Sequence, residues 1–169
     1  MAIYYADGSN SADGRIIQTV GVRFNTASTT SSTTFVDTGL TKTITSKGTN
    51  SQFICHCSLS YDCAANGLYA RAVFQINRAV AGGNTNTFTG ASEDGGVYIG
   101  AHTGTQHIRF YGVFGHSIFD PQSLMGNVAA GTNITYKVVM KTESVNNSRD
   151  IRINQGGRDS FMIIQEISS

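Results

Sequence analysis

The sequence predicts an all-β protein folded as an antiparallel sandwich or barrel of about eight to ten strands. Apolar and polar residues alternate at period two along most of the chain, which is typical of half-buried strands. No window of a dozen residues carries the apolar stripe of a helix. The stretches between the alternating segments are rich in Gly, Asn, Asp and Ser, the residues that form turns.

The composition bounds the size of the protein and the classes of partner. A chain of 169 residues has the length of a single domain. Its 17 Ser, 19 Thr and 19 Gly make up close to a third of the residues. Because 40% of the residues are hydrophobic and the net charge is only +1, we expect a folded core rather than disorder. The near-neutral balance argues against a nucleic-acid partner, and no apolar run is long enough for membrane insertion.

The N-terminus and the cysteines predict where the chain is made. Residues 1–8 lack the basic region and the long apolar stretch of a secretory signal. The three cysteines are an odd number at close spacing, which is a poor framework for disulfides. We therefore expect reduced thiols in a protein made and assembled in a cytoplasm.

Strands are predicted in order along the chain from the phase of the apolar residues. They cover residues 15–24, 40–45, 53–61, 68–76, 108–119, 134–141, 151–153 and 161–167. In the first of them, Ile16 is expected on the same face as Val20 and Val22. Thr and Ser on the opposite faces suit exposed positions of pleated strands.

Three segments do not fit this pattern. Residues 1–14 are predicted to be an extended arm that precedes a sandwich domain of residues 15–169. Residues 80–96 are predicted to be a long loop, of a length that tends to carry function. Residues 122–132, after the single proline, form a third connection.

The segment 108–119 is apolar on both faces, and Gly112 and Gly115 predict a bulge in it. Two apolar faces are more than one core needs, so we expect a subunit interface along this segment. Its predicted lining is Val113 and Phe119 or, on the opposite face, Phe110 and Phe114.

Cys55, His56, Cys57 and Cys63 are the strongest candidates for a metal site. Zinc needs four converging ligands, but neighbours on a strand point to opposite faces, so His56 should point away from Cys55 and Cys57. We therefore interpret the cysteines as core residues and assign no metal.

Other candidates for chemistry are weaker. The remaining histidines have no partner motif for nucleophilic catalysis, so we expect no enzyme, no catalytic residue and no cofactor. The loop of residues 80–96 and the residues that follow it could instead hold a ligand, such as a glycan. The candidate contacts are Asn84, Asn86, Glu93, Asp94 and Tyr98, with Tyr111.

The order of several short stretches resembles virion proteins of marine tailed phages, including cyanophages. These stretches are residues 3–8 (IYYADG), 14–18 (GRIIQ), 34–45 (TFVDTGLTKTIT), 118–121 (IFDP), 131–141, 151–154 (IRIN) and 161–167 (FMIIQEI). Together they cover most of the chain. Two features depart from the pattern: the arm contains no long shaft region, and residues 82–96 are particular to this chain.

The resemblance implies a jelly-roll sandwich similar to those of the tumour necrosis factor type, which are usually trimers. It also implies a non-enzymatic structural protein on the virion surface, as a capsid decoration or as a short fibre or knob. Its partners would be other virion proteins and two further copies of itself. The alternative is a fibre-tip domain that binds a receptor or carbohydrate. The predicted attachment residues are Ile3, Tyr4, Tyr5, Asp7, Ile16 and Ile17.

Overall fold

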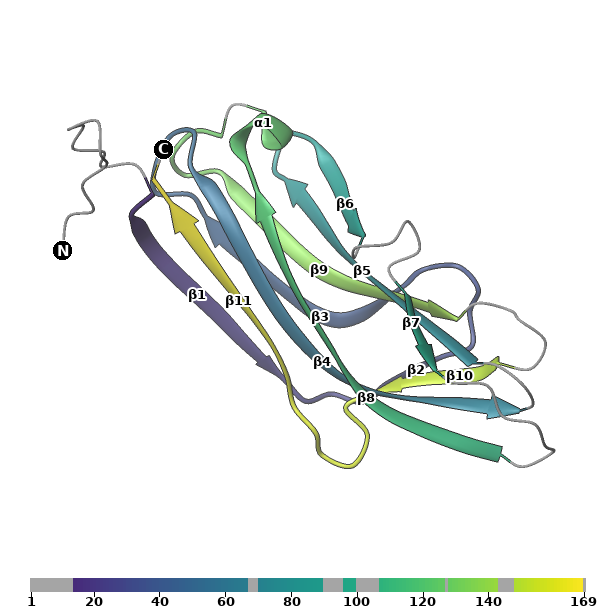
Figure 1. Cartoon of the computed structure of the whole chain (residues 1–169). Coiled ribbons are helices and arrows are strands. Elements are labelled where there is room, and N and C mark those ends of the chain that lie inside the picture. Colours follow the sequence, from purple (N-terminus) through teal and green to yellow (C-terminus); the bar gives the residue numbers. More distant parts are fainter. Residues whose placement is uncertain are drawn as a thin grey trace, which may run out of the picture.

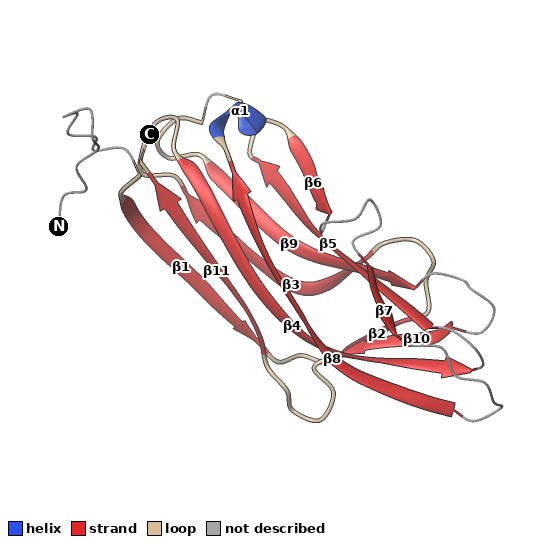
Figure 2. Cartoon of the chain, in the orientation of Figure 1, coloured by secondary structure: helices blue, strands red, loops and turns tan. Residues whose placement is uncertain are grey.

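The computed structural model of the protein describes residues 14–66, 70–89, 96–99, 107–126, 128–142 and 148–168. These ranges hold eleven strands and one short helix, which Figures 1 and 2 show. In chain order they are β1 (Ile16–Phe24), β2 (Ser28–Thr30), β3 (Val36–Thr45), β4 (Gln52–Asn66), β5 (Ala70–Val80), β6 (Thr85–Thr89), β7 (Gly96–Ile99), β8 (His107–Asp120), α1 (Gln122–Met125), β9 (Asn133–Thr142), β10 (Ser148–Ile153) and β11 (Ser160–Ile167).

The strands form two antiparallel sheets that pack face to face (Figure 1). Sheet A has the order β1-β11-β4-β10-β2, and β8 pairs with the other edge of β4. Sheet B has the order β3-β9-β5-β6, and β7 also pairs with β5. Strands that are distant in the sequence are neighbours in both sheets, β1 beside β11 in sheet A and β3 beside β9 in sheet B, as in a jelly roll. The predicted antiparallel jelly-roll sandwich is confirmed.

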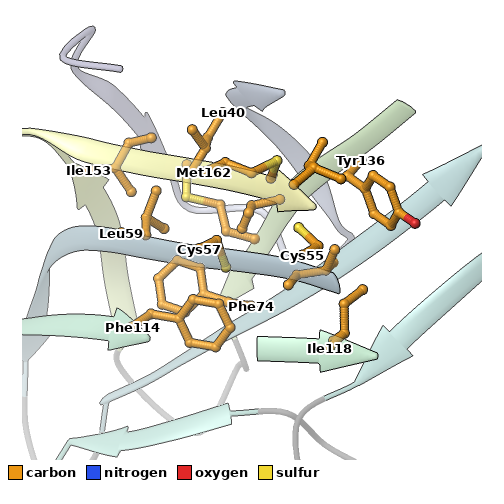
Figure 3. Packing of buried hydrophobic residues seen from close by; sticks show 14 of the residues in the cluster. Leu40, Cys55, Cys57, Leu59, Phe74, Phe114, Ile118, Tyr136, Ile153 and Met162 are labelled. Carbon is orange, nitrogen blue, oxygen red and sulfur yellow. The ribbon is translucent and has the colours of Figure 1, made fainter. Parts of the chain in front are cut away.

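The core lies between the sheets and is lined by alternate residues of each strand. In β4, Phe53, Cys55, Cys57 and Leu59 all point inward and are almost fully buried. Figure 3 shows Cys55 and Cys57 among Leu40, Met162 and Tyr136, with Phe74 and Phe114 stacked beside them. The ring of Phe74 lies 5.2 Å from that of Tyr61 and 5.0 Å from that of Phe114, measured between centroids.

The structure corrects two predictions about local geometry. The predicted loop of residues 80–96 contains β6, which pairs with β5 and leaves a short turn at residues 81–84. Gly112 and Gly115 produce no bulge, because β8 pairs with β4 in an unbroken register from His107 to Asp120. The three strands that the sequence did not predict are β2, β6 and β7.

A third correction concerns β1. Val20, Val22 and Phe24 pack against the core as predicted, but Ile16 is 49% exposed. The pairing of β1 with β11 shifts between Ile16 and Gln18, and this irregularity turns Ile16 off the inner face. The far end of β1 packs closely on β3, since a Cβ added to Gly39 would lie 2.7 Å from the ring of Phe24.

The inward leucine of β4 gives a direct test of this packing. Leu59→Ala removes a fully buried side chain, so we expect the free energy of unfolding to fall by about 2–5 kcal/mol. The control is Leu124→Ala, which makes the same change at a side chain that is 46% exposed and should cost less than about 1 kcal/mol. Urea denaturation measures both. Equal losses would contradict the assignment of Leu59 to the core.

Candidate functional site

The outward side of sheet A carries a set of large apolar side chains. Val113 and Phe119 of β8 are 63% and 55% exposed, and Phe161 and Ile163 of β11 are 46% and 36% exposed. Ile54, between them on β4, is half-buried. We call these five residues the outer apolar face.

Strand register brings these residues together. Paired residues in neighbouring strands lie on the same side of a sheet, and β4 pairs with β11 on one edge and β8 on the other. Phe119 lies directly opposite Ile54, and Val113 lies opposite Ser60. Ile163 lies opposite His56, one side-chain position along β4 from Ile54. The outer apolar face therefore spans three adjacent strands.

The middle of this surface is polar and holds no Lys, Arg, Asp or Glu. The Nδ1 atom of His56 lies 2.7 Å from the hydroxyl of Ser117, so the two side chains bond across β4 and β8. Gly115 lies next to them, and a Cβ added there would meet no atom within 4 Å. Ion pairs lie at its margins: Arg23 of β1 pairs with Asp159, and Arg152 of β10 pairs with Asp150.

The outward side of sheet B is different in kind. Thr41, Thr43 and Thr45 of β3 are exposed in a row. The hydroxyl of Thr43 lies 2.8 Å from that of Thr135, and the hydroxyl of Thr45 donates to the side-chain oxygen of Asn133 at 2.7 Å. The prediction that Thr coats the exposed faces holds for sheet B, whereas sheet A exposes apolar side chains.

The cysteines occupy the positions that the sequence predicted. Cys55, Cys57 and Cys63 are buried in the core and form no disulfide, and His56 points to the opposite face of β4. Burial raises the pKa of Cys57 to about 12 and also raises that of Cys55, so both thiols stay protonated. No group of three or more His, Cys, Asp or Glu within the described ranges could hold a metal ion.

One buried ion pair joins the two sheets. The guanidinium of Arg78 on β5 donates to both carboxylate oxygens of Asp120, at 3.0 and 3.2 Å. The side chains of Arg78 and Asp120 are both fully buried. The hydroxyl of Tyr136 donates to Asp120 at 2.7 Å. Arg78 also donates to the carbonyls of Leu124 in α1, at 3.0 Å, and Asn84, at 3.3 Å.

A second buried carboxylate holds the turn between β3 and β4. Glu166 on β11 accepts hydrogen bonds from the backbone N–H groups of Lys47 and Gly48 and from the hydroxyl of Ser46, at 2.9–3.0 Å. Gln18 of β1 donates to the same carboxylate. Burial alone would raise the pKa of Glu166, but the bonds from Gly48 and Lys47 outweigh it and hold this pKa below its ordinary value.

The structure separates the predicted interface residues. Val113 and Phe119 are exposed, but Phe114 points inward and packs against Phe74 in the core. Phe110 lies on β8, but its side chain is outside the described part. Phe161 and Ile163 were missed as surface residues. Their signal is the unbroken apolar run of residues 161–164, which places apolar side chains on both faces of a strand.

The other predicted site residues are only partly described. Among the attachment residues, Ile3, Tyr4, Tyr5 and Asp7 lie outside the described ranges, while Ile16 is exposed and Ile17 half-buried at the start of β1. Among the ligand-loop residues, Glu93 and Asp94 lie outside those ranges, as do the side chains of Asn86, Tyr98 and Tyr111. Asn84 is exposed in the turn before β6. None of the helical residues in the described ranges forms a helix long enough to cross a membrane.

Comparison with known proteins gives no family. Neither the protein-family models nor the curated proteins match the chain. Among solved structures, the fold is similar to infectious bursal disease virus, strain Gx (TM-score 0.47, 11% identity) and strain Gt (TM-score 0.47, 12% identity). The matches cover 89% and 100% of this chain, which spans only 40% and 42% of those chains. We draw no functional conclusion from likeness at this level.

The Glu166 contacts predict a pH-dependent stability. Because its pKa is lowered on folding, its stabilisation is present above its ordinary value of 4.5 and is lost as the pH falls through the folded-state pKa. Glu166→Gln should lower the free energy of unfolding by about 1–3 kcal/mol at pH 7, since it leaves backbone donors unpaired. It should also flatten the decline below pH 4.5. Urea denaturation from pH 7 to acid measures both effects, and equal slopes for variant and parent would contradict them.

The buried ion pair predicts a non-additive double mutant. Arg78→Met leaves the Asp120 carboxylate buried without its cation, so we expect a loss of about 3–5 kcal/mol in the free energy of unfolding. Adding Asp120→Asn removes that charge but keeps an acceptor for Tyr136, and it should restore part of the loss. Denaturation of both single variants and the double variant measures the coupling. Simple addition of the two losses would show that the pair is not coupled.

Proposed function

We propose that the chain is a non-enzymatic structural protein on the exterior of a tailed-phage virion, either a capsid decoration or a short fibre or knob. In this proposal it is made in the host cytoplasm, assembles as a homotrimer and attaches to other virion proteins through its N-terminal arm. The phage, the arm and the trimer come from the sequence resemblance. The observation that carries a structural role is the outer apolar face of sheet A.

An exposed surface of this kind supports assembly. Soluble proteins that remain alone seldom leave large apolar side chains together on one flat face, and such faces mark interaction sites. Phe119 of β8, Ile54 of β4 and Ile163 of β11 lie on three neighbouring strands, with no Lys, Arg, Asp or Glu between them. A docking surface accounts for them, whereas the polar face of sheet B suits contact with water.

The buried reactive groups support a structural role over catalysis. The carboxylates of Asp120 and Glu166 are each bonded by several donors that hold neighbouring segments in place. The thiols of Cys55 and Cys57 are buried and protonated. These groups stabilise the sandwich, and a substrate could not reach them without opening it.

The start of the described chain supports attachment at one end of the sandwich. The N–H of Gly14 donates to the carbonyl of Ser168 at 3.0 Å, so the arm departs beside the C-terminal strand. Figure 1 shows α1 toward the same end. Exposed Leu124 lies there in α1, and exposed Ile16 lies at the start of β1, opposite Ile167 of β11. A second virion protein could contact this end.

Deletion of residues 1–14 tests the proposal. The sandwich should stay folded, because β1 begins at Ile16, but the shortened chain should be lost from purified particles of the virus that encodes it. Circular dichroism checks the fold, and mass spectrometry with immunogold electron microscopy checks incorporation. Full-length chain missing from purified particles would overturn the virion role. Normal incorporation of the shortened chain would show that the arm is not the anchor.

A further inference from the structure

We propose that copies of this chain associate through the outer apolar face and the adjoining edge of β8, so that the surfaces around Gly115 and Phe119 of the copies meet at a common axis. This inference rests on the proposed structural role and names the partner of its docking surface. The partner is a second copy of the chain.

The edge of β8 supports association because it is long and unguarded. β8 has 14 residues, and in the described chain its pairing partner is β4 alone. Arg109 and Asp120 lie near its two ends, but residues 110–119 between them contain no Lys, Arg, Asp, Glu or Pro, and the strand carries no bulge. Proteins that remain monomeric protect such edges with charges, prolines or bulges. The middle of this edge has none of these features, so it is suited to contact with another protein surface.

The absence of charge favours a second copy as that cover. In a contact between identical surfaces, each charge lies near copies of itself, so such interfaces are depleted of charge and more apolar than contacts between different proteins. The positions between Phe161 and Phe119 are Ser58, His56 and Gly115, with Ser117 beside them. The ion pair of Arg23 with Asp159 stays at the rim.

The distribution of exposed apolar residues agrees. Six large hydrophobic side chains are exposed in the described ranges, and four belong to the outer apolar face. The other two, Ile16 and Leu124, lie in β1 and α1. Among the side chains that the structure describes, the outer apolar face is therefore the largest group of exposed apolar residues that a second copy can offer.

Gly115 supplies a place for close approach. A glycine within a strand often marks a point where another chain comes near, and Gly115 is exposed with open space above its Cα. Val113 and Ser117 flank it on the same side of β8. The resulting notch would admit a side chain from the neighbouring copy.

Gly115→Glu tests the inference, because the new side chain fits the isolated chain but would add a charge to the contact. Sedimentation velocity and native mass spectrometry of the full chain at micromolar concentration should give a multiple of 18.0 kDa. Gly115→Glu should weaken this association by roughly 100-fold or more, since repeated like charges cost several kcal/mol. Thr43→Glu, which adds the same charge to the outward side of sheet B, should leave the mass unchanged.

Circular dichroism shows whether each variant is folded. If Gly115→Glu does not fold, Phe119→Ser, which removes an exposed ring from the same surface, tests the interface in its place. A monomeric parent protein would overturn the inference. So would a folded variant at either position that keeps the parent mass, or equal dissociation by Thr43→Glu. This result can be separated from the virion role. If the chain is missing from particles but still forms an oligomer that Gly115→Glu disrupts, the interface stands and the proposed function is wrong.

Discussion

The buried contact of Arg78 with Asp120 is the constraint on which the β8 side of the sandwich depends. Arg78 belongs to β5 in sheet B, and Asp120 is the last residue of β8 in sheet A. The same guanidinium holds the carbonyls of Leu124 and Asn84. Two charges can remain in an apolar interior only if they are paired and fully bonded, so the end of β8, α1 and the turn before β6 must keep one arrangement.

This constraint also fixes the alignment of the outer apolar face. With its end held by Arg78, β8 keeps its unbroken register on β4, and that register aligns Phe119 with Ile54 and Val113 with Ser60. Sheet A thus has an apolar side turned to the core and exposed apolar side chains turned outward. Along β3 and β9 of sheet B, exposed threonines instead bond to neighbouring side chains. The two sides of the sandwich are built for different surroundings.

The sequence predicted what depends on alternation and missed what depends on distant partners. β4 was recognised because its inward residues, such as Phe53 and Leu59, alternate with polar ones. β6 was hidden because its residues read as loop, and it pairs through β5. Asp120 lies 42 residues from Arg78 in the sequence, so local sequence patterns do not predict their contact. For Phe161 and Ile163, a two-sided apolar run indicates a second buried face but does not identify its cover.

The position of β11 between β1 and β4 has a consequence for biosynthesis. The residues of β1 pair with residues 160–167 of β11. β1 therefore cannot pair in sheet A until the more than 130 residues between the two strands and β11 itself have been translated. Sheet A cannot close on the ribosome before β11 has left the exit tunnel. Contacts this distant in sequence also slow folding, because a long loop must close before any of them forms. β1 and the part of β4 that pairs with β11 therefore lack this partner until residues 160–167 have been made.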